Sequence, residues 1–188
     1  MYLIKRLQNL LLSPTAEWPV IKQEQLSVAQ IYVKYLLFYA ALPSIGFLLS
    51  FMGKPSFIGA VRLAIISYVV WLLAFNFAPV IINWLAPTFS STPNTNYAFK
   101  LVAFSVIPLL LAGLLSFIPY LGLILSIIGA AYSAYLCYYG LPVLMQTPED
   151  KLVPYTVTTI VVVLIVYFVP MIVLGLIFNA NLWEFLSL

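Results

Sequence analysis

The stretch LVAFSVIPLLLAGLLSFIPYLGLILSIIGAAYSAYLCYYGLPVLMQTP, residues 101–148, runs for 48 residues without one charged side chain. The hydrocarbon core of a bilayer is about 30 Å thick, and about 20 helical residues cross it. As one straight helix this stretch would be about 72 Å long, so the chain must turn back within it. Three further uncharged stretches, at 35–53, 63–99 and 152–183, contain 19, 37 and 32 residues. The sequence therefore predicts an all-α integral membrane protein.

The composition supports this fold class and excludes others. Of the 188 residues, 64% are hydrophobic and 7% are charged, whereas about 25% are charged in soluble domains. The apolar stretches are continuous and lack the alternation that a membrane barrel requires. We expect a single membrane domain over residues 1–188. The net charge of +3 includes no dense basic run, which argues against nucleic acid as a partner.

We expect a bundle of five transmembrane spans. The long uncharged stretch divides at SFIPYLG (116–122), where Pro119 and Gly122 permit a tight hairpin. The polar segments 87–97 and 146–151 separate the neighbouring spans. Residues 1–32 precede the first span and are expected to form interfacial helices. The expected spans cover residues 33–52, 63–86, 100–118, 121–145 and 154–178.

The segment YLIKRLQNLLL (2–12) is amphipathic. Apolar residues share one helical face and polar residues lie opposite, which is typical of a helix lying in the membrane interface. We therefore predict a membrane-surface face and its basic flank, made of Leu3, Leu7, Leu10, Lys5 and Arg6.

The positive charges predict the orientation. If the N-terminus is cytoplasmic, six cations lie on that side and only Lys54 and Arg62 lie opposite, as the positive-inside rule requires. The C-terminus then lies on the far side. The side chains of Lys34, Arg62 and Lys100, at span ends, are expected to extend toward the headgroups. The six cytoplasmic cations are Lys5, Arg6, Lys22, Lys34, Lys100 and Lys151.

The chain offers little material for catalysis. It contains no histidine, and its carboxylates fall in the expected interfacial or loop segments. No metal-ligand spacing, nucleophile–base pair or glycine-rich phosphate loop is present. We expect no enzymatic activity, no cofactor and no metal site. The carboxylates are Glu17, Glu24, Glu149, Asp150 and Glu184.

One polar loop is a candidate docking site. Glu149, Asp150 and Lys151 are consecutive charged residues between the last two spans. Such a loop docks a partner or binds a cation, or it is simply a solvated turn. Both interpretations remain open.

Two groups of uncharged residues are candidates for contacts within the membrane. Small residues spaced along one helix let a second helix approach closely, and polar residues in a span hydrogen-bond across helices or line a cavity. For the second group, interhelical hydrogen bonds and core packing remain the alternative to a cavity. The candidate packing strip is Gly122, Ser126, Gly129, Ala130 and Ser133, and the candidate polar cavity is Asn76, Asn83, Tyr132, Tyr135 and Tyr139.

Two segments resemble a known family. SPTAEWPVIKQE (13–24) resembles the opening of bacterial members of the Yip family (Ypt/Rab-interacting proteins). Residues 97–157 are similar to the Yip domain: a tyrosine then a proline in the third span, an Ile-Pro hairpin, and a tyrosine-rich fourth span ending in YYGLPVLM. The resemblance implies a five-span bundle with a cytoplasmic N-terminus, and it implies a bacterial inner membrane for a chain this short.

The resemblance also bears on the expected function. Eukaryotic relatives are associated with vesicle traffic, membrane shaping and binding of Rab GTPases. This chain lacks their long N-terminal region and its DLYGP-type motif, so Rab-type GTPase binding is not carried over. We expect a non-enzymatic protein that contacts membrane lipids and other membrane proteins, or a second copy of itself, in membrane organisation or trafficking-like processes. The alternative is a transporter or channel for a small solute or lipid, with a cavity shaped by kinked spans.

Overall fold

The structure, a computed structural model, describes residues 2–52, 57–118 and 120–177, apart from the side chains of residues 2–4. Five helical stretches in this part of the chain are long and apolar enough to cross a membrane. The prediction of a five-span all-α bundle is confirmed. The spans run Val28–Ser50, Phe57–Phe89, Thr95–Phe117, Leu121–Met145 and Glu149–Ile177.

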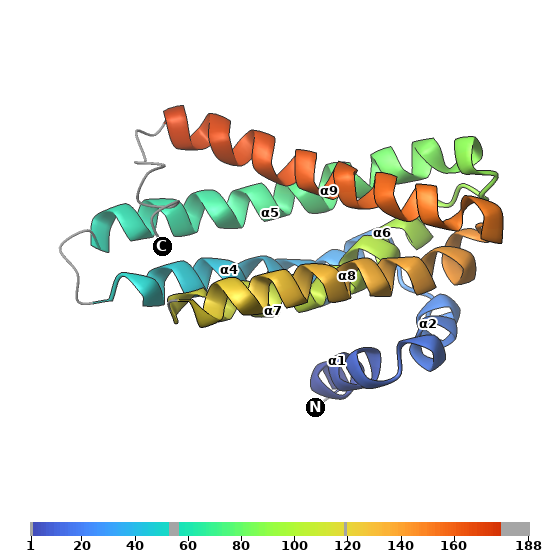
Figure 1. The fold of residues 1–188 in the computed structure, drawn as a ribbon, viewed down its shortest axis with the longest axis horizontal. Coiled ribbons are helices and arrows are strands. Elements are labelled where there is room, and N and C mark those ends of the chain that lie inside the picture. Colours follow the sequence, from blue (N-terminus) through green and yellow to red (C-terminus); the bar gives the residue numbers. More distant parts are fainter. Residues whose placement is uncertain (1, 53–56, 119, 178–188) are drawn as a thin grey trace.

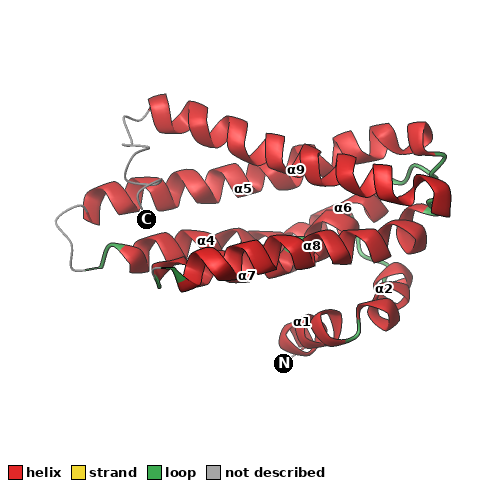
Figure 2. Cartoon of the chain, viewed as in Figure 1, coloured by secondary structure: helices red, strands yellow, loops and turns green. Residues whose placement is uncertain are grey.

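The spans form two layers (Figure 1). Helices α5 (Phe57–Leu85) and α9 (Glu149–Ile177) lie side by side in one layer, and α4 (Leu37–Ser50), α7 (Ile107–Leu114) and α8 (Leu121–Met145) form the other. Helix α6 (Thr95–Ser105) contacts both α5 and α8 near one end. Figure 2 shows that the connections at this end are short. Two hydrogen-bonded loops meet there, because Thr92 N donates to the Met145 carbonyl at 2.8 Å.

The first span is continuous from a capped start. Ser27 precedes α3 (Val28–Ile31), its hydroxyl accepts from the Gln30 amide, and the Gln30 side chain accepts from the Ser27 amide. This reciprocal pair satisfies two amides that would otherwise lack partners at the helix start. One wider π turn, η1 (Tyr32–Leu36), joins α3 to α4.

The second and third spans each end in a short 3₁₀ turn. Helix α5 continues into η2 (Ala86–Phe89), and α7 continues into η3 (Leu115–Phe117). The hairpin after η3 lies where the sequence places it, within 116–122, although Pro119 lies outside the described residues. A Cβ on Gly122 would stand 2.8 Å from the Ser116 Cα, so only glycine fits this turn.

The third span differs from its prediction. It begins at Thr95 rather than at residue 100, and it breaks between α6 and α7 at Val106. Pro108 causes the break, because it has no amide proton and its ring clashes with the preceding turn. The Ser133 hydroxyl of α8 accepts a hydrogen bond from the Leu109 amide at 3.3 Å, so the neighbouring helix supplies a partner at the break.

Two helices precede the first span and fold back on the bundle. Helix α1 (Tyr2–Leu12) and helix α2 (Pro14–Gln23) are joined at Ser13, and α2 contacts α8. In Figure 1, α2 lies near the end where α6 begins and where α8 passes into α9, and α1 extends from it below α8. This arrangement places the N-terminal helices against the protein.

Candidate functional site

Three charged side chains meet inside the N-terminal helices. Arg6 of α1 donates through Nη1 to Glu17 of α2 and through Nη2 to Glu24, just after α2. Arg6 is only 4% exposed and Glu17 is 7% exposed. A charge buried this far from water requires ionic and hydrogen-bonding partners. The two carboxylates therefore hold α1 against α2.

This ion cluster corrects the expectation for Arg6. The sequence places Arg6 on the solvated flank of an interfacial helix and Glu17 and Glu24 in interfacial segments. Helix α2 instead turns at Ser13 so that Glu17 and Glu24 face Arg6. Lys5, beside Arg6 in the sequence, remains exposed.

Lys100 joins the N-terminal helices to the third span. Its Nζ donates to the backbone carbonyls of Ile21, at 2.8 Å, and of Lys22, at 3.3 Å, as well as to that of Glu24. These carbonyls lie at the end of α2. The last carbonyls of a helix have no amide donors within the helix, and the helix dipole favours a positive charge there. Lys100 is 1% exposed. The expectation that it extends toward the headgroups is corrected, because the span begins five residues earlier.

The apolar face of α1 and the tryptophan of α2 also pack on the bundle. Leu10 is fully buried in the core, and Leu7 packs against the same core. Leu10 therefore contacts protein rather than a membrane surface, because α1 folds back toward the bundle. The hydroxyl of Tyr132 on α8 donates to the Leu11 carbonyl at 2.7 Å. The side chain of Leu3 lies outside the described residues.

Trp18 is fixed by a notch in α8. Its indole is fully buried, and a Cβ on Gly140 would stand 2.8 Å from Trp18 Cζ2 and 2.7 Å from Leu101 Cδ1. Any larger side chain at position 140 would occupy the space of the indole. The glycine of the YYGLP segment therefore creates the seat for Trp18.

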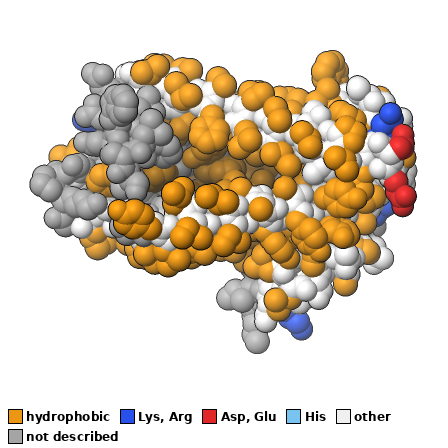
Figure 3. Space-filling view, viewed as in Figure 1, with side chains coloured by type: hydrophobic (Ala, Val, Ile, Leu, Met, Phe, Trp, Pro, Cys, Tyr) orange, Lys and Arg blue, Asp and Glu red, His pale blue; other side chains and the backbone are white. Residues whose placement is uncertain are grey.

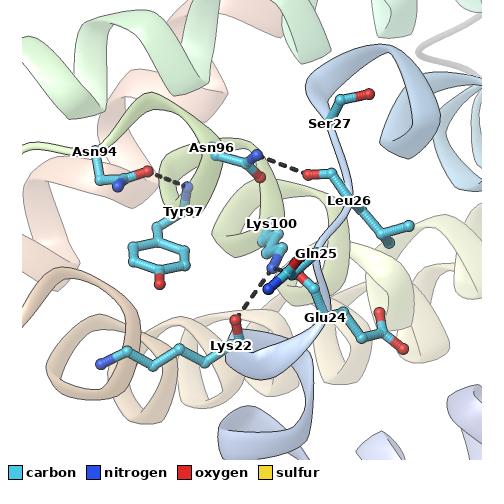
Figure 4. Close-up of a pocket in the computed structure, with 9 residues that line it drawn as sticks. All are labelled: Lys22, Glu24, Gln25, Leu26, Ser27, Asn94, Asn96, Tyr97 and Lys100. Atoms are coloured by element: carbon cyan, nitrogen blue, oxygen red, sulfur yellow. Dashed lines mark hydrogen bonds between the residues drawn. The ribbon is translucent and has the colours of Figure 1, made fainter.

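A polar hollow of about 400 Å³ lies beside this junction (Figure 4). Five of its lining residues come from the end of α2 and the connection to α3, and four come from the start of α6. Asn94 caps α6 by accepting from the Tyr97 amide at 3.1 Å, and the Asn96 amide group donates to the Leu26 carbonyl at 2.6 Å. The ammonium groups of Lys22 and Lys100 lie 5.9 and 5.5 Å from the centre of the Tyr97 ring. We call this site the basic hollow.

The predicted packing strip lies partly against α7. A Cβ on Gly129 would stand 2.7 Å from the Pro108 carbonyl oxygen, so α7 and α8 approach closely there. Ser133 meets the break in the third span, as described above. The Ser126 hydroxyl bonds back to the Gly122 carbonyl of its own helix, and Ala130 is exposed.

The candidate cavity residues are divided between two helices. Asn76 is exposed on α5 and donates to the Leu72 carbonyl one turn earlier. Asn83 donates to the Thr95 hydroxyl at 3.4 Å, at the turn between the second and third spans. Neither asparagine is among the residues that line the basic hollow.

The three tyrosines of the candidate cavity stack along α8. The ring centres of Tyr132 and Tyr135 are 5.3 Å apart, and those of Tyr135 and Tyr139 are 4.8 Å apart. They form one aromatic stripe, which begins where Tyr132 meets α1.

The candidate docking loop is helical. Glu149 and Asp150 form the first turn of α9, and both are exposed. Acidic residues stabilise a helix start through the helix dipole, which explains why the helix begins five residues before the expected span. Lys151 lies 3.7 Å from the Asp150 carboxylate.

Sequence reasoning did not identify the ion cluster or the basic hollow. A signal was present, because Arg6, Glu17 and Glu24 are opposite charges close together in a chain with few charges. Their pairing depends on the angle at Ser13, and the role of Lys100 depends on where the third span begins. Neither quantity follows from hydropathy.

Comparison with known proteins places the chain in a family. The model of the Yip1 domain matches residues 9–171, from α1 into α9. "Inner membrane protein YohC" is 23% identical over 165 residues, which cover 79% of this chain and 83% of that protein, in each of two strains of Escherichia coli. No solved structure matches this chain. A five-span helical membrane protein whose sequence matches this domain over most of its length belongs to the Yip1 domain family.

Proposed function

We propose that this protein is a non-enzymatic component of a bacterial inner membrane that acts through lipid and protein contacts in the plane of the bilayer. The observation that carries this proposal is the exposure of the last two spans. Within an apolar 18-residue stretch of each span, 22% of the residues are buried in the fourth span and 17% in the fifth, against 72% in the third. The inner-membrane location of the E. coli relative supports the compartment.

The exposed faces of α8 and α9 are apolar. In the part of Figure 3 that is not grey, hydrophobic side chains cover most of the face, which is hollowed between α8 and α9. Outside a membrane, such a surface would mark an interaction site or cause aggregation. Within a bilayer it contacts lipid tails or a helix of another membrane protein, including a second copy of this chain. The exposed side chains include Ile124, Ile127 and Ile128 of α8 and Leu164, Ile165 and Phe168 of α9.

The buried charges support a contact function over a catalytic one. Arg6 and Glu17 are engaged with each other, and Lys100 donates to backbone carbonyls. Each of these groups joins segments of the fold, so none is held ready for a substrate.

Site-specific photo-crosslinking tests the proposed contacts. A photoreactive phenylalanine analogue at Ile128 or at Ile165 should form adducts with lipid or with another membrane protein in intact membranes. The same analogue at Leu136, which is fully buried on α8, is the control and should react within the chain. Exposed positions that give no more external adducts than position 136 would contradict the proposal.

The transporter alternative receives less support. It needs a polar cavity at mid-membrane depth, whereas the basic hollow lies at the end of the bundle and Asn76 and Asn83 are not part of it. Reconstituted liposomes decide between the two functions. We expect no solute flux above that of empty liposomes, and flux that Asn83→Leu abolishes would establish transport instead.

We also propose that the N-terminus is cytoplasmic. Helix α2, the start of α6 and the start of α9 lie toward one end of the bundle, and they include Lys22, Lys100 and Lys151. Lys151→Cys and Arg62→Cys, each made in a Cys137→Ser background, test this orientation. A membrane-impermeant maleimide applied to spheroplasts should label position 62, and should label position 151 only after permeabilisation. The reverse pattern would invert the topology.

A further inference from the structure

The basic hollow contains more positive charge than its partners neutralise. The ammonium groups of Lys22 and Lys100 face the same Tyr97 ring, from 5.9 and 5.5 Å. The carboxylate that lines the hollow, Glu24, already accepts from Arg6. Tyr97 stabilises nearby cations only weakly. An anion is the group that this arrangement still favours.

The two ammonium groups differ in what they can bind. Lys100 has three N–H donors, and three backbone carbonyls accept them. Lys100 therefore supplies charge but no donor to a ligand. The Lys22 ammonium makes no hydrogen bond or ion pair with any residue that the structure describes. Its three donors are available at the edge of the hollow.

A buried acceptor completes the chemistry. The Asn96 Oδ1 atom is buried and accepts no hydrogen bond within the described part of the chain, while its amide nitrogen is held by Leu26. A buried acceptor without a donor is unfavourable. A ligand that carries both an anionic group and a hydroxyl would satisfy Lys22 and Asn96 together.

The position of the hollow indicates the source of that ligand. Its residues border Val28 and Thr95, where the first and third spans begin. Span ends lie at the level of the lipid headgroups. A volume of about 400 Å³ is that of a small-ligand site and accommodates a headgroup whose acyl chains remain in the bilayer.

We propose that the basic hollow binds the phosphate ester headgroup of an anionic phospholipid that carries a hydroxyl, as a phosphoglycerol group does. Lys22 donates to the phosphate oxygens, Lys100 contributes the second positive charge, and Asn96 Oδ1 accepts from the headgroup hydroxyl. This inference rests on the proposed lipid-contact function and specifies the class of lipid. The residues of the basic hollow are separate from the exposed faces of α8 and α9, so an experiment can contradict one proposal and leave the other standing.

Native mass spectrometry of the full chain in detergent tests this binding. Phosphatidylglycerol should bind more tightly than phosphatidylcholine, because the hollow favours net negative charge. Phosphatidylmethanol has the same charge but no headgroup hydroxyl, so it should bind more weakly than phosphatidylglycerol. Equal binding of phosphatidylglycerol and phosphatidylcholine would overturn the proposal, and equal binding of phosphatidylglycerol and phosphatidylmethanol would overturn the role of Asn96.

Substitutions at Lys22 locate the site. Lys22→Gln should weaken phosphatidylglycerol binding about fivefold, the usual effect of one basic residue at a lipid surface. Lys22→Arg should retain it, and Lys34→Gln, which removes an exposed cation outside the hollow, should leave it unchanged. Equal losses in Lys22→Gln and Lys34→Gln would show nonspecific attraction and overturn the site.

Two controls separate the remaining explanations. Lys22→Gln keeps the backbone carbonyl that accepts from Lys100, so its melting temperature should match that of the unsubstituted protein. Glycerol 1-phosphate and inorganic phosphate should compete poorly with the lipid. If glycerol 1-phosphate competes on equal terms, the ligand is a soluble phosphate ester and the lipid assignment is overturned, whereas the crosslinks at positions 128 and 165 would be unaffected.

Discussion

Arg6 shows how one residue can fix the position of two helices. Its guanidinium is almost fully buried and bonds to two carboxylates, one from α2 and one just after it. Such a contact specifies geometry, because a displaced helix would leave buried charges without partners. Close packing around Leu10 and Trp18 then fills the same junction.

Removing Arg6 should destabilise the fold strongly. Arg6→Met leaves the buried Glu17 and the partly buried Glu24 without their cation, which is expected to cost about 3 kcal/mol or more. Lys5→Met removes an exposed charge one residue away and should change stability little. Thermal unfolding in detergent measures both variants. Adding Glu17→Gln and Glu24→Gln to Arg6→Met should restore part of the loss, and equal melting temperatures for Arg6→Met and Lys5→Met would refute the role of the cluster.

For single residues, the sequence predicts which side chains lie outside the apolar spans better than it predicts which charged side chains bond to one another. Glu149 and Asp150 were recognised as exposed because no apolar run includes them, although they proved helical. Arg6 and Lys100 were expected at the surface because a single charge near a span end normally reaches water. Their burial depends on partners on other helices, which the local sequence does not indicate.

At the scale of elements, the bundle depends on close helix crossings at small residues. A Cβ on Gly46 of α4 would overlap the Gly113 carbonyl oxygen of α7. Helices in a bilayer gain little from hydrophobic association and depend on such close packing. The candidate strip on α8 was visible from its regular spacing, whereas Gly46 and Gly113 are isolated glycines on separate spans.

The two glycines of this crossing should differ in tolerance. Gly46→Ala forces a backbone carbonyl to move and should lower the free energy of unfolding by about 2 kcal/mol, a typical cost of overpacking. Gly113→Ala meets the Pro43 side chain at 2.9 Å and should cost less. Titration with a denaturing detergent compares them. A larger loss for Gly113→Ala than for Gly46→Ala would contradict this crossing.

The break between α6 and α7 shows what hydropathy misses within a span. An apolar run predicts that a segment crosses the membrane, and four such runs, the longest divided at its hairpin, gave the five spans. It does not predict that Pro108 divides one run into two helices, or that Ser133 of the next span contacts the break. The proline was visible in the sequence, but its partner is a tertiary contact.

At the scale of the whole molecule, the helices are held together unequally along the length of the bundle. Near the far end, α9 is held to α5 by a small cluster of Leu63, Ile66, Val70 and Met171. The core that contains the N-terminal helices is much larger and lies toward the opposite end. The distal half of α9 should therefore be the least stable part of the bundle.

Met171→Ala tests this unequal stability. It removes the α9 side chain that is buried against α5, so amide exchange over residues 164–177 should accelerate about tenfold, equivalent to about 1.4 kcal/mol of local opening. Exchange over α8 should not change. Leu176→Ala, at an exposed position on the same helix, is the control. Uniform acceleration across all spans would show instead that the bundle opens as one unit.

The seat of Trp18 on α8 also determines when the N-terminal helices can dock during synthesis. Helices α1 and α2 leave the ribosome first, yet 121 positions separate Leu11 from Tyr132, its partner on α8, and Gly140 follows later still. Until the fourth span has been synthesised, the N-terminal helices have no seat. The amphipathic segment 2–12 can rest at the membrane surface during this interval. Docking of the first segment made is therefore among the last steps of biogenesis.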